Sequence, residues 1–254
     1  MTPASSSHRL EPLRHVDAGV LDVAYYEAGP TDGPVVVLLH GFPYDIHSYV
    51  DVAPDLAAQG CRTIVPYLRG YGPTRFRDKA TPRSGEQAAL GVDLIALIGA
   101  LGIQRAVFAG YDWGGRAACV GAALWPARCA GLVSLNSYNI QDIAKAMVPA
   151  SAEREVALWY QYYFQLERGR AGLAEGDPHY ADVQRRLAAQ PAISVPAITL
   201  DGAGDGVFPA NDGTATAKKF SGPRSHRVIP RAGHNLPQEE PEAFAAAVME
   251  LIKA

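Results

Sequence analysis

The chain has 254 residues, of which 48% are hydrophobic and 19% are charged, so it is long enough for one large folded domain and too apolar for a disordered chain. A net charge of −3 gives no electrostatic reason to expect nucleic acid or an anionic membrane as a partner, and a small neutral organic substrate fits better. We expect a cytoplasmic protein, because the N-terminus lacks an apolar signal-peptide core and no apolar run reaches the length of a membrane span.

Short apolar runs predict the strands of a largely parallel sheet. The run at residues 20–29 alternates as a half-buried strand does. The later runs are apolar on both faces, as in strands covered by helices on each side, and they span residues 35–40, 62–67, 105–111, 131–136 and 195–202. Segments with helical spacing lie between and after them, around residues 49–59, 85–101, 114–124, 214–220 and 241–253. This alternation predicts an α/β fold with ligands bound at the carboxyl ends of the strands.

One stretch, residues 139–191, interrupts the alternation. It contains no strand-like run, and its two segments with helical spacing, 153–169 and 179–190, are joined by glycine-rich sequence. We interpret it as a small helical cap inserted into a core made of residues 1–138 and 192–254.

The stretch AGYDWGGRA, residues 109–117, predicts an abrupt turn from a buried strand into a helix, with Asp112 at the turn. Gly110, Gly114 and Gly115 are small residues that let the backbone pack tightly there. This pattern is typical of a nucleophile elbow, where the N-terminus of the helix favours a negative charge. A simple helix cap is the alternative, since aspartate is among the best N-cap residues.

A second signal follows the strand predicted at residues 35–40. The sequence LLHGFP places a loop there whose backbone could donate a hydrogen bond to a developing oxyanion. The backbone N–H groups of Phe42 and Trp113 are the candidate donors.

Two later loops carry a candidate acid and a candidate base. The sequence LDGAGDGVFP places Asp205 just beyond a buried strand, and Asp201, nearer the strand end, is the alternative acid. The sequence IPRAGHN places His234 in a loop before the last helix. Nucleophile, acid and histidine therefore follow one another in the chain order known for hydrolases with a nucleophile elbow.

With these motifs the sequence resembles the aspartate-nucleophile branch of the α/β hydrolase superfamily, the epoxide hydrolases and haloalkane dehalogenases, along nearly its full length. HGFP, RGYG at residues 69–72, GYDWGG, GxxD and GHN all stand in the expected places. The resemblance implies an α/β hydrolase fold with a mostly parallel central sheet, helices on both faces and a helical cap. It also implies a catalytic triad of Asp112, Asp205 and His234, and a substrate pocket that includes His40, Trp113 and Trp159.

An aspartate nucleophile predicts a particular chemistry. A carboxylate is a poor nucleophile toward an acyl carbon, because the adduct would be an anhydride, but at a saturated carbon it forms an ester. Water deprotonated by His234 can then cleave that ester, while Asp205 orients the imidazole and stabilises its positive charge. We therefore expect an epoxide opened to a vicinal diol through a covalent ester on Asp112, and not an ordinary esterase or lipase.

An epoxide also needs a general acid, because its alkoxide is too basic to leave unaided. In the epoxide hydrolases tyrosines of the cap supply this acid. The candidates here are Tyr160, Tyr162, Tyr163 and Tyr180. Aromatic residues at helical spacing are otherwise packing groups.

Haloalkane dehalogenation by the same triad is the alternative, since a halide needs only N–H donors in a dry pocket. Trp113 and Trp159 would be those donors. Haloalkane dehalogenases often have asparagine where this chain has Phe42, and that departure favours the epoxide. A third possibility is a ligand-binding or weakly active member of the fold, because the predicted cap is shorter than the family usually carries.

No cofactor or metal is expected. The seven histidines lack ligand spacing, the three cysteines form no C-x-x-C motif, and the predicted reaction requires neither. The expected partners are a small neutral organic substrate and water, and a homodimer is left open.

Overall fold

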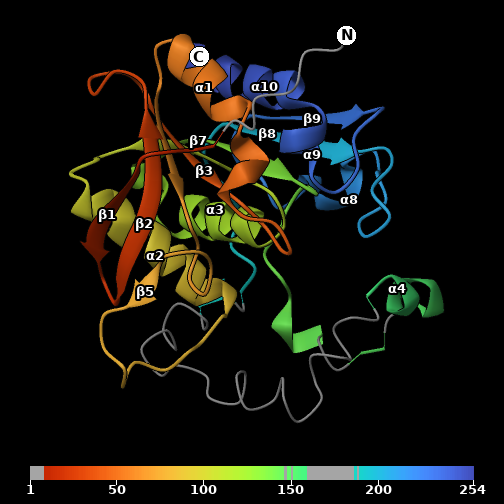
Figure 1. The fold of residues 1–254 in the computed structure, drawn as a ribbon. Coiled ribbons are helices and arrows are strands. Elements are labelled where there is room, and N and C mark those ends of the chain that lie inside the picture. Colours follow the sequence, from red (N-terminus) through yellow and green to blue (C-terminus); the bar gives the residue numbers. More distant parts are fainter. Residues whose placement is uncertain (1–8, 146–147, 150, 159–185, 188) are drawn as a thin grey trace, which may run out of the picture.

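The computed structural model describes residues 9–145, 148–149, 151–158, 186–187 and 189–254. Within these residues the strands form a nine-stranded sheet in the order β1-β2-β4-β3-β6-β7-β8-β9, and β5 pairs with β2 (Figure 1). The strands are β1 (Leu13–Ala18), β2 (Leu21–Ala28), β3 (Val35–Leu39), β4 (Arg62–Pro66), β5 (Arg75–Phe76), β6 (Ala106–Gly110), β7 (Cys129–Leu135), β8 (Ala197–Gly202) and β9 (Arg224–Ile229).

The sheet is mostly parallel, as predicted. From β4 through β3, β6, β7 and β8 to β9, each strand pairs parallel with its neighbour, whereas β2 pairs antiparallel with β1, β4 and β5. Sequence analysis missed β1 and β5, and it gave no apolar run for β9, whose residues are all half-buried or exposed. Most of β1 is exposed or half-buried, so it lacks an apolar run, and β5 has only two residues and cannot carry a pattern.

The helices also follow the prediction closely. They are η1 (Ile46–Tyr49), α1 (Val52–Ala58), α2 (Gln87–Ala100), α3 (Asp112–Leu124), η2 (Pro126–Arg128), η3 (Ile143–Lys145), α4 (Ala152–Ala157), α8 (Thr214–Ala217), α9 (Leu236–Glu239) and α10 (Pro241–Lys253). The helix predicted at residues 49–59 corresponds to α1, which begins later, and the 3-10 turn η1 before it was not predicted. The four-residue helix α9 was not predicted, since it is too short for helical periodicity.

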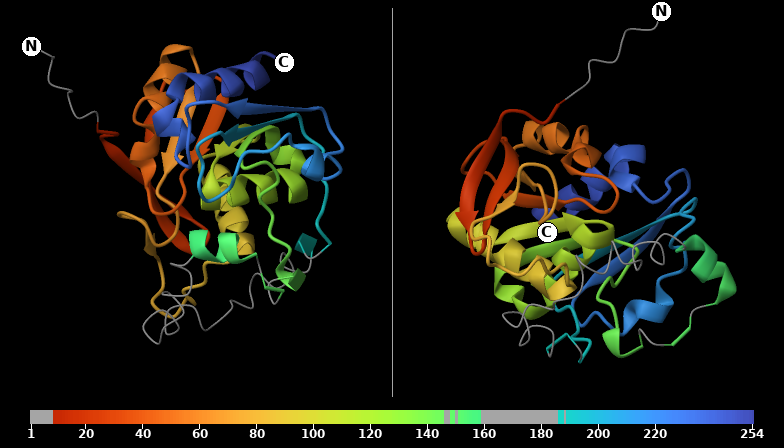
Figure 2. Two further views of the ribbon diagram at one scale, coloured as in Figure 1. Left: turned by 90° about the vertical axis from the view of Figure 1, so that its right-hand side faces the viewer. Right: turned by 60° about the horizontal axis from the view of Figure 1, so that its bottom comes forward.

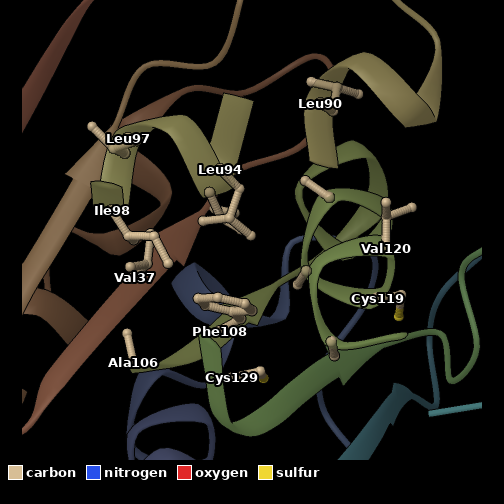
Figure 3. Close-up of a cluster of buried hydrophobic side chains, with 14 of the residues drawn as sticks. Val37, Leu90, Leu94, Leu97, Ile98, Ala106, Phe108, Cys119, Val120 and Cys129 are labelled. Atoms are coloured by element: carbon tan, nitrogen blue, oxygen red, sulfur yellow. The ribbon is translucent and has the colours of Figure 1, made fainter. Parts of the chain in front are cut away.

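The core lies on both faces of the sheet, and β6 shows why its sequence is apolar throughout. Ala106 and Phe108 belong to the cluster with residues of α2 and α3, while Val107 and Ala109 belong to the cluster with residues of α1 and α10. Figure 3 shows Phe108 within the first of these clusters, and Figure 2 shows helices on either side of the sheet. A central strand that is covered on both faces needs apolar residues at every position.

The segment at residues 139–191, predicted as a helical cap, is described in part. Its described residues include η3 and α4, and Ser151 caps α4 by accepting a hydrogen bond from the backbone N–H of Arg154. In Figures 1 and 2, α4 lies at the far end of the molecule from α1 and α10. Trp159, Tyr160, Tyr162, Tyr163 and Tyr180 all lie outside the described residues. The boundaries of the cap stay a prediction.

Among the described helices, none combines the length and apolar character that crossing a bilayer requires. Cys61, Cys119 and Cys129 are buried thiols without disulfide partners. The described part of the chain also holds no cluster of three or more histidine, cysteine, aspartate or glutamate side chains suited to a metal ion.

Candidate active site

The residues singled out in the sequence come together at one edge of the sheet. Phe42 follows β3, Asp112 follows β6, Asp205 follows β8 and His234 follows β9. These four strands run in the same direction, so their carboxyl ends meet at that edge. Residues far apart in the chain therefore form one polar cluster.

Asp112 stands at a sharp turn between β6 and α3. Its φ of +48° lies in the left-handed region, which non-glycine residues rarely adopt. The N-cap of α3 is Tyr111, so Asp112 is not the helix cap. The turn needs glycine nearby: a Cβ on Gly41 would stand 2.5 Å from the Cβ of Asp112, and one on Gly114 would collide with the carbonyl of Leu39. This geometry raises the carboxylate above the sheet edge, as expected of a nucleophile elbow.

The carboxylate of Asp112 faces the loop after β3. The backbone N–H of Phe42 donates a hydrogen bond of 2.8 Å to Asp112 Oδ1. Trp113, the second expected donor, lies in the first turn of α3, where backbone N–H groups have no acceptor within the helix. The Trp113 ring is half-buried, and the guanidinium carbon of Arg116 lies 4.2 Å from the centroid of this ring.

Asp205 is held by four hydrogen-bond donors. Its Oδ1 accepts bonds from the backbone N–H groups of Val207 and Phe208, at 2.8 and 2.9 Å. Its Oδ2 bonds His234 Nδ1 at 3.0 Å and accepts a bond from Asn136 Nδ2 at 3.1 Å. Burial alone would raise the pKa of Asp205, but the hydrogen bonds from His234 and the backbone outweigh it, and the pKa falls below its ordinary value.

His234 lies between two carboxylates. Its Nε2 is 3.8 Å from Asp112 Oδ2, which is too far for a direct hydrogen bond. Burial lowers the pKa of the imidazole, but the hydrogen bond and charge of Asp205 and the charge of Asp112 overcome that effect and raise it above the ordinary value. Since Nδ1 donates to Asp205, Nε2 of the neutral ring is left to accept a proton. The ring of Phe208 stacks on this imidazole, with the centroids 5.8 Å apart.

Asp201, the alternative acid, has different partners. Its Oδ2 accepts hydrogen bonds from the backbone and the side chain of Asn211, at 3.1 and 3.0 Å. The same oxygen is 3.9 Å from His226 Nε2. The structure therefore brings Asp205, and not Asp201, into contact with His234.

His40 departs from the expectation that it lines the substrate pocket. Its side chain has no exposed surface, and its Nε2 accepts a hydrogen bond of 3.1 Å from the backbone N–H of Leu68. Burial lowers the pKa of His40 to about 4, so the ring is neutral at physiological pH and suited to accept this bond. His40 joins the loop after β3 to the loop after β4.

The RGYG stretch at residues 69–72 supports the same loops. The Arg69 guanidinium makes two hydrogen bonds to the carboxylate of Asp93 on α2, at 2.6 and 2.7 Å, and a third to the backbone carbonyl of Ser84. Buried, bidentate pairs of this kind fix geometry strongly. Arg69 thus ties the loop after β4 to helix α2.

Two contacts of the site were not predicted from the sequence, those of Asn136 and Phe208. Asn136 carried a weak signal, because it ends the strand predicted at residues 131–136 and so lies at the same sheet edge. Phe208 carried none, since its backbone N–H and its ring act only through the folded loop after β8. A cavity of about 180 Å³ opens beside both, lined by Asn136, Arg154, Asp201, Phe208, Pro209 and Asn211.

Comparison with known proteins agrees with this fold. Residues 34–190 match the family model described as the alpha/beta hydrolase fold. Epoxide hydrolase B of Mycobacterium tuberculosis is 31% identical over 153 residues, which cover 54% of this chain and 41% of that protein. Epoxide hydrolase A of the same organism is 30% identical over 178 residues, covering 68% of this chain and 53% of that protein. The matched part is therefore about half the length of these relatives.

A solved structure matches over almost the whole chain. It is described as a "putative epoxide hydrolase" from Klebsiella pneumoniae, with a TM-score of 0.92 and 38% sequence identity, and the match covers 98% of this chain and 100% of that one. Sheet order, elbow geometry and both kinds of comparison lead to one conclusion. The chain belongs to the alpha/beta hydrolase family.

Proposed function

We propose that the protein hydrolyses an epoxide to a vicinal diol through a covalent ester on Asp112. One observation carries the proposal: the carboxylate at the elbow is bonded through one oxygen to the N–H of Phe42, while its other oxygen faces His234 across 3.8 Å. A carboxylate in the position of the nucleophile favours attack at saturated carbon. The names of the relatives support an epoxide as the electrophile.

In the first step Asp112 Oδ2 forms a bond to one epoxide carbon as the bond from that carbon to the ring oxygen breaks. The electron pair of the broken bond goes to the oxygen, which takes a proton from a general acid. Tyr160, Tyr162, Tyr163 and Tyr180 remain the proposed acids of the cap. The product is an ester between Asp112 and the opened substrate.

In the second step water attacks the carbonyl carbon of this ester and gives a proton to His234 Nε2. The negative charge develops on Asp112 Oδ1, where the N–H of Phe42 can stabilise it. The tetrahedral intermediate expels the alkoxide, which takes the proton from His234 and leaves as the diol. The carboxyl group of Asp112 returns its proton to the cap acid, so that one water molecule is consumed in total.

The charge of Asp112 links the two steps. In the free protein this charge helps to raise the pKa of His234. Forming the ester removes the charge, and the pKa of His234 must then fall. The imidazole therefore becomes neutral more readily at the moment when it has to accept a proton from water.

Isotope labelling tests the ester directly. A single turnover of styrene oxide with excess protein in water enriched in oxygen-18 should yield unlabelled diol and place the label in the peptide that contains Asp112. This follows because water attacks the ester carbonyl and not the substrate carbon. Label in the diol alone would contradict an ester on Asp112.

Two substitutions separate the proposal from its alternatives. H234Q should accumulate the ester, visible as a mass increase of the intact protein, and D112A should form none. A bromoalkane run in parallel tests dehalogenation, in which an adduct would appear together with bromide. Absence of an adduct from both substrates, with retained ligand binding, would favour a binding protein of this fold.

A further inference from the structure

Asn136 contacts the acid of the proposed site from the end of β7. Its Nδ2 donates a hydrogen bond of 3.1 Å to Asp205 Oδ2, the oxygen that also bonds His234 Nδ1 at 3.0 Å. The other carboxylate oxygen is held by the backbone N–H groups of Val207 and Phe208. Asn136 therefore acts on the oxygen that faces the base.

Asn136 holds this contact at a local cost. Its φ is +61°, in the left-handed region, which asparagine tolerates better than most residues. Its Oδ1 is buried and has no hydrogen-bond donor among the described residues. Turning the amide over would place Oδ1 against the carboxylate of Asp205, so the observed orientation is the only favourable one. A buried polar atom left without a partner calls for an explanation, and the bond to Asp205 supplies it.

We infer that Asn136 is a positioning residue, which keeps Asp205 Oδ2 directed at His234 Nδ1 and so keeps Nε2 ready to accept a proton. This deepens the proposed function and rests on it. The backbone donors to Oδ1 cannot be removed by changing a side chain, whereas the bond from Asn136 can. The residue acts only in hydrolysis of the ester, because His234 takes no proton while the ester forms.

The first experiment compares N136A with N139A. Asn139 lies in the same turn, but its Nδ2 donates to Ser134 Oγ and to the backbone carbonyl of Leu135, and not to Asp205. Single turnovers followed by mass should show ester formation within about twofold of wild type for both variants. Ester hydrolysis should slow about tenfold in N136A, the loss expected for one hydrogen bond to a charged group, and stay unchanged in N139A. Equal hydrolysis rates in N136A and wild type would overturn the inference.

A double substitution tests whether Asn136 acts through Asp205. In the D205N background, adding N136A should slow ester hydrolysis by less than about twofold, because the partner of the asparagine is already changed. A further tenfold loss there would mean that Asn136 acts by another route.

The last experiment needs no substrate. The proton on His234 Nδ1 should give a low-field NMR resonance in the resting protein, identified by its absence in H234Q. N136A should shift or broaden this resonance, whereas N139A should not, and this result is obtained even if wild type forms no ester. An unchanged resonance in N136A would count against the inference. If N136A does not fold, N136S, which keeps a donor, replaces it, with smaller changes expected in the same measurements.

Discussion

Asp201 and Asp205 lie four residues apart at the end of β8 and are 1% and 4% exposed. Their surroundings nevertheless shift the pKa values of the two carboxyl groups in opposite directions. Asp205 receives hydrogen bonds at both oxygens, and its pKa lies below the ordinary value. Among the residues that the structure describes, Asp201 has donors from Asn211 alone, and its Oδ1 has none. Burial is the dominant influence there and raises its pKa.

The comparison teaches that burial by itself does not identify a catalytic acid. A buried carboxylate stays ionised only where donors replace the water that it has lost. Asp205 has such donors, and one of them is the imidazole that it would orient. Asp201 is the same residue type at almost the same place in the chain, but its donors reach one oxygen only, and none of them is His234.

The largest expected difference between the two aspartates concerns ester hydrolysis. D205N should slow it about 10³- to 10⁴-fold, because an amide cannot hold His234 in the tautomer that leaves Nε2 free. D201N should change it less than about threefold. Decay of the ester after a single turnover, followed by mass, measures the rate in both variants. A similar decrease of the rate in D205N and D201N would contradict the distinction between the two aspartates.

The next largest difference between D205N and D201N should be in the pH dependence of ester hydrolysis. Ester hydrolysis requires neutral His234, so its rate should fall as the pH drops through the pKa of this residue. Asp205 raises that pKa through a hydrogen bond and a charge, so D205N should move the acid limb to lower pH. D201N should leave the limb in place. The measurement is the rate of ester decay between pH 5 and 9, and a limb that shifts upward in D205N would contradict this assignment.

Thermal unfolding should show a smaller difference between the D205N and D201N variants. The folded pKa of Asp205 is depressed, so its stabilising contribution is present above the unfolded pKa and is lost as the pH falls through the folded value. The folded pKa of Asp201 is raised, so its ionisation opposes folding at neutral pH. D205N should lower Tm by about 3–6 °C at pH 7, whereas D201N should leave Tm unchanged or raise it. Calorimetry of both variants measures these Tm values. A larger decrease of Tm in D201N than in D205N would contradict the prediction.

The smallest expected effect concerns Phe208, whose backbone N–H bonds Asp205 and whose ring stacks on His234. F208L keeps the backbone N–H that bonds Asp205 but removes the ring stacked on His234. Stacking of this kind contributes about 0.5–1 kcal/mol, so ester hydrolysis should slow about two- to fivefold. F76L is the control. Phe208 lies beneath Arg154, and Phe76 on β5 likewise lies beneath two arginines, Arg83 and Arg69, but outside the site. Equal rates in F208L and F76L would remove any role for the ring.

Much of the fold was predictable because its signals are local. Strands with two buried faces are recognisable as apolar runs, as β6 is. The glycines around Asp112 predict the sharp turn, where the structure gives Asp112 a φ of +48°. The edge strand β1 escaped prediction because a strand that is largely exposed has no need for apolar residues. His40 was expected in the pocket, but it is fully buried and accepts a hydrogen bond from Leu68, 28 residues away.

The amino-acid sequence by itself determined the alternation of strands and helices, the elbow at Asp112 and the order of the candidate residues, since each depends on neighbours in the chain. Only the tertiary structure decided which aspartate meets His234, that Asn136 bonds the same carboxylate, and that His40 is buried. Those outcomes depend on hydrogen bonds between loops that are distant in sequence. The parallel sheet brings such loops to one edge, and their exact partners are set by packing in three dimensions.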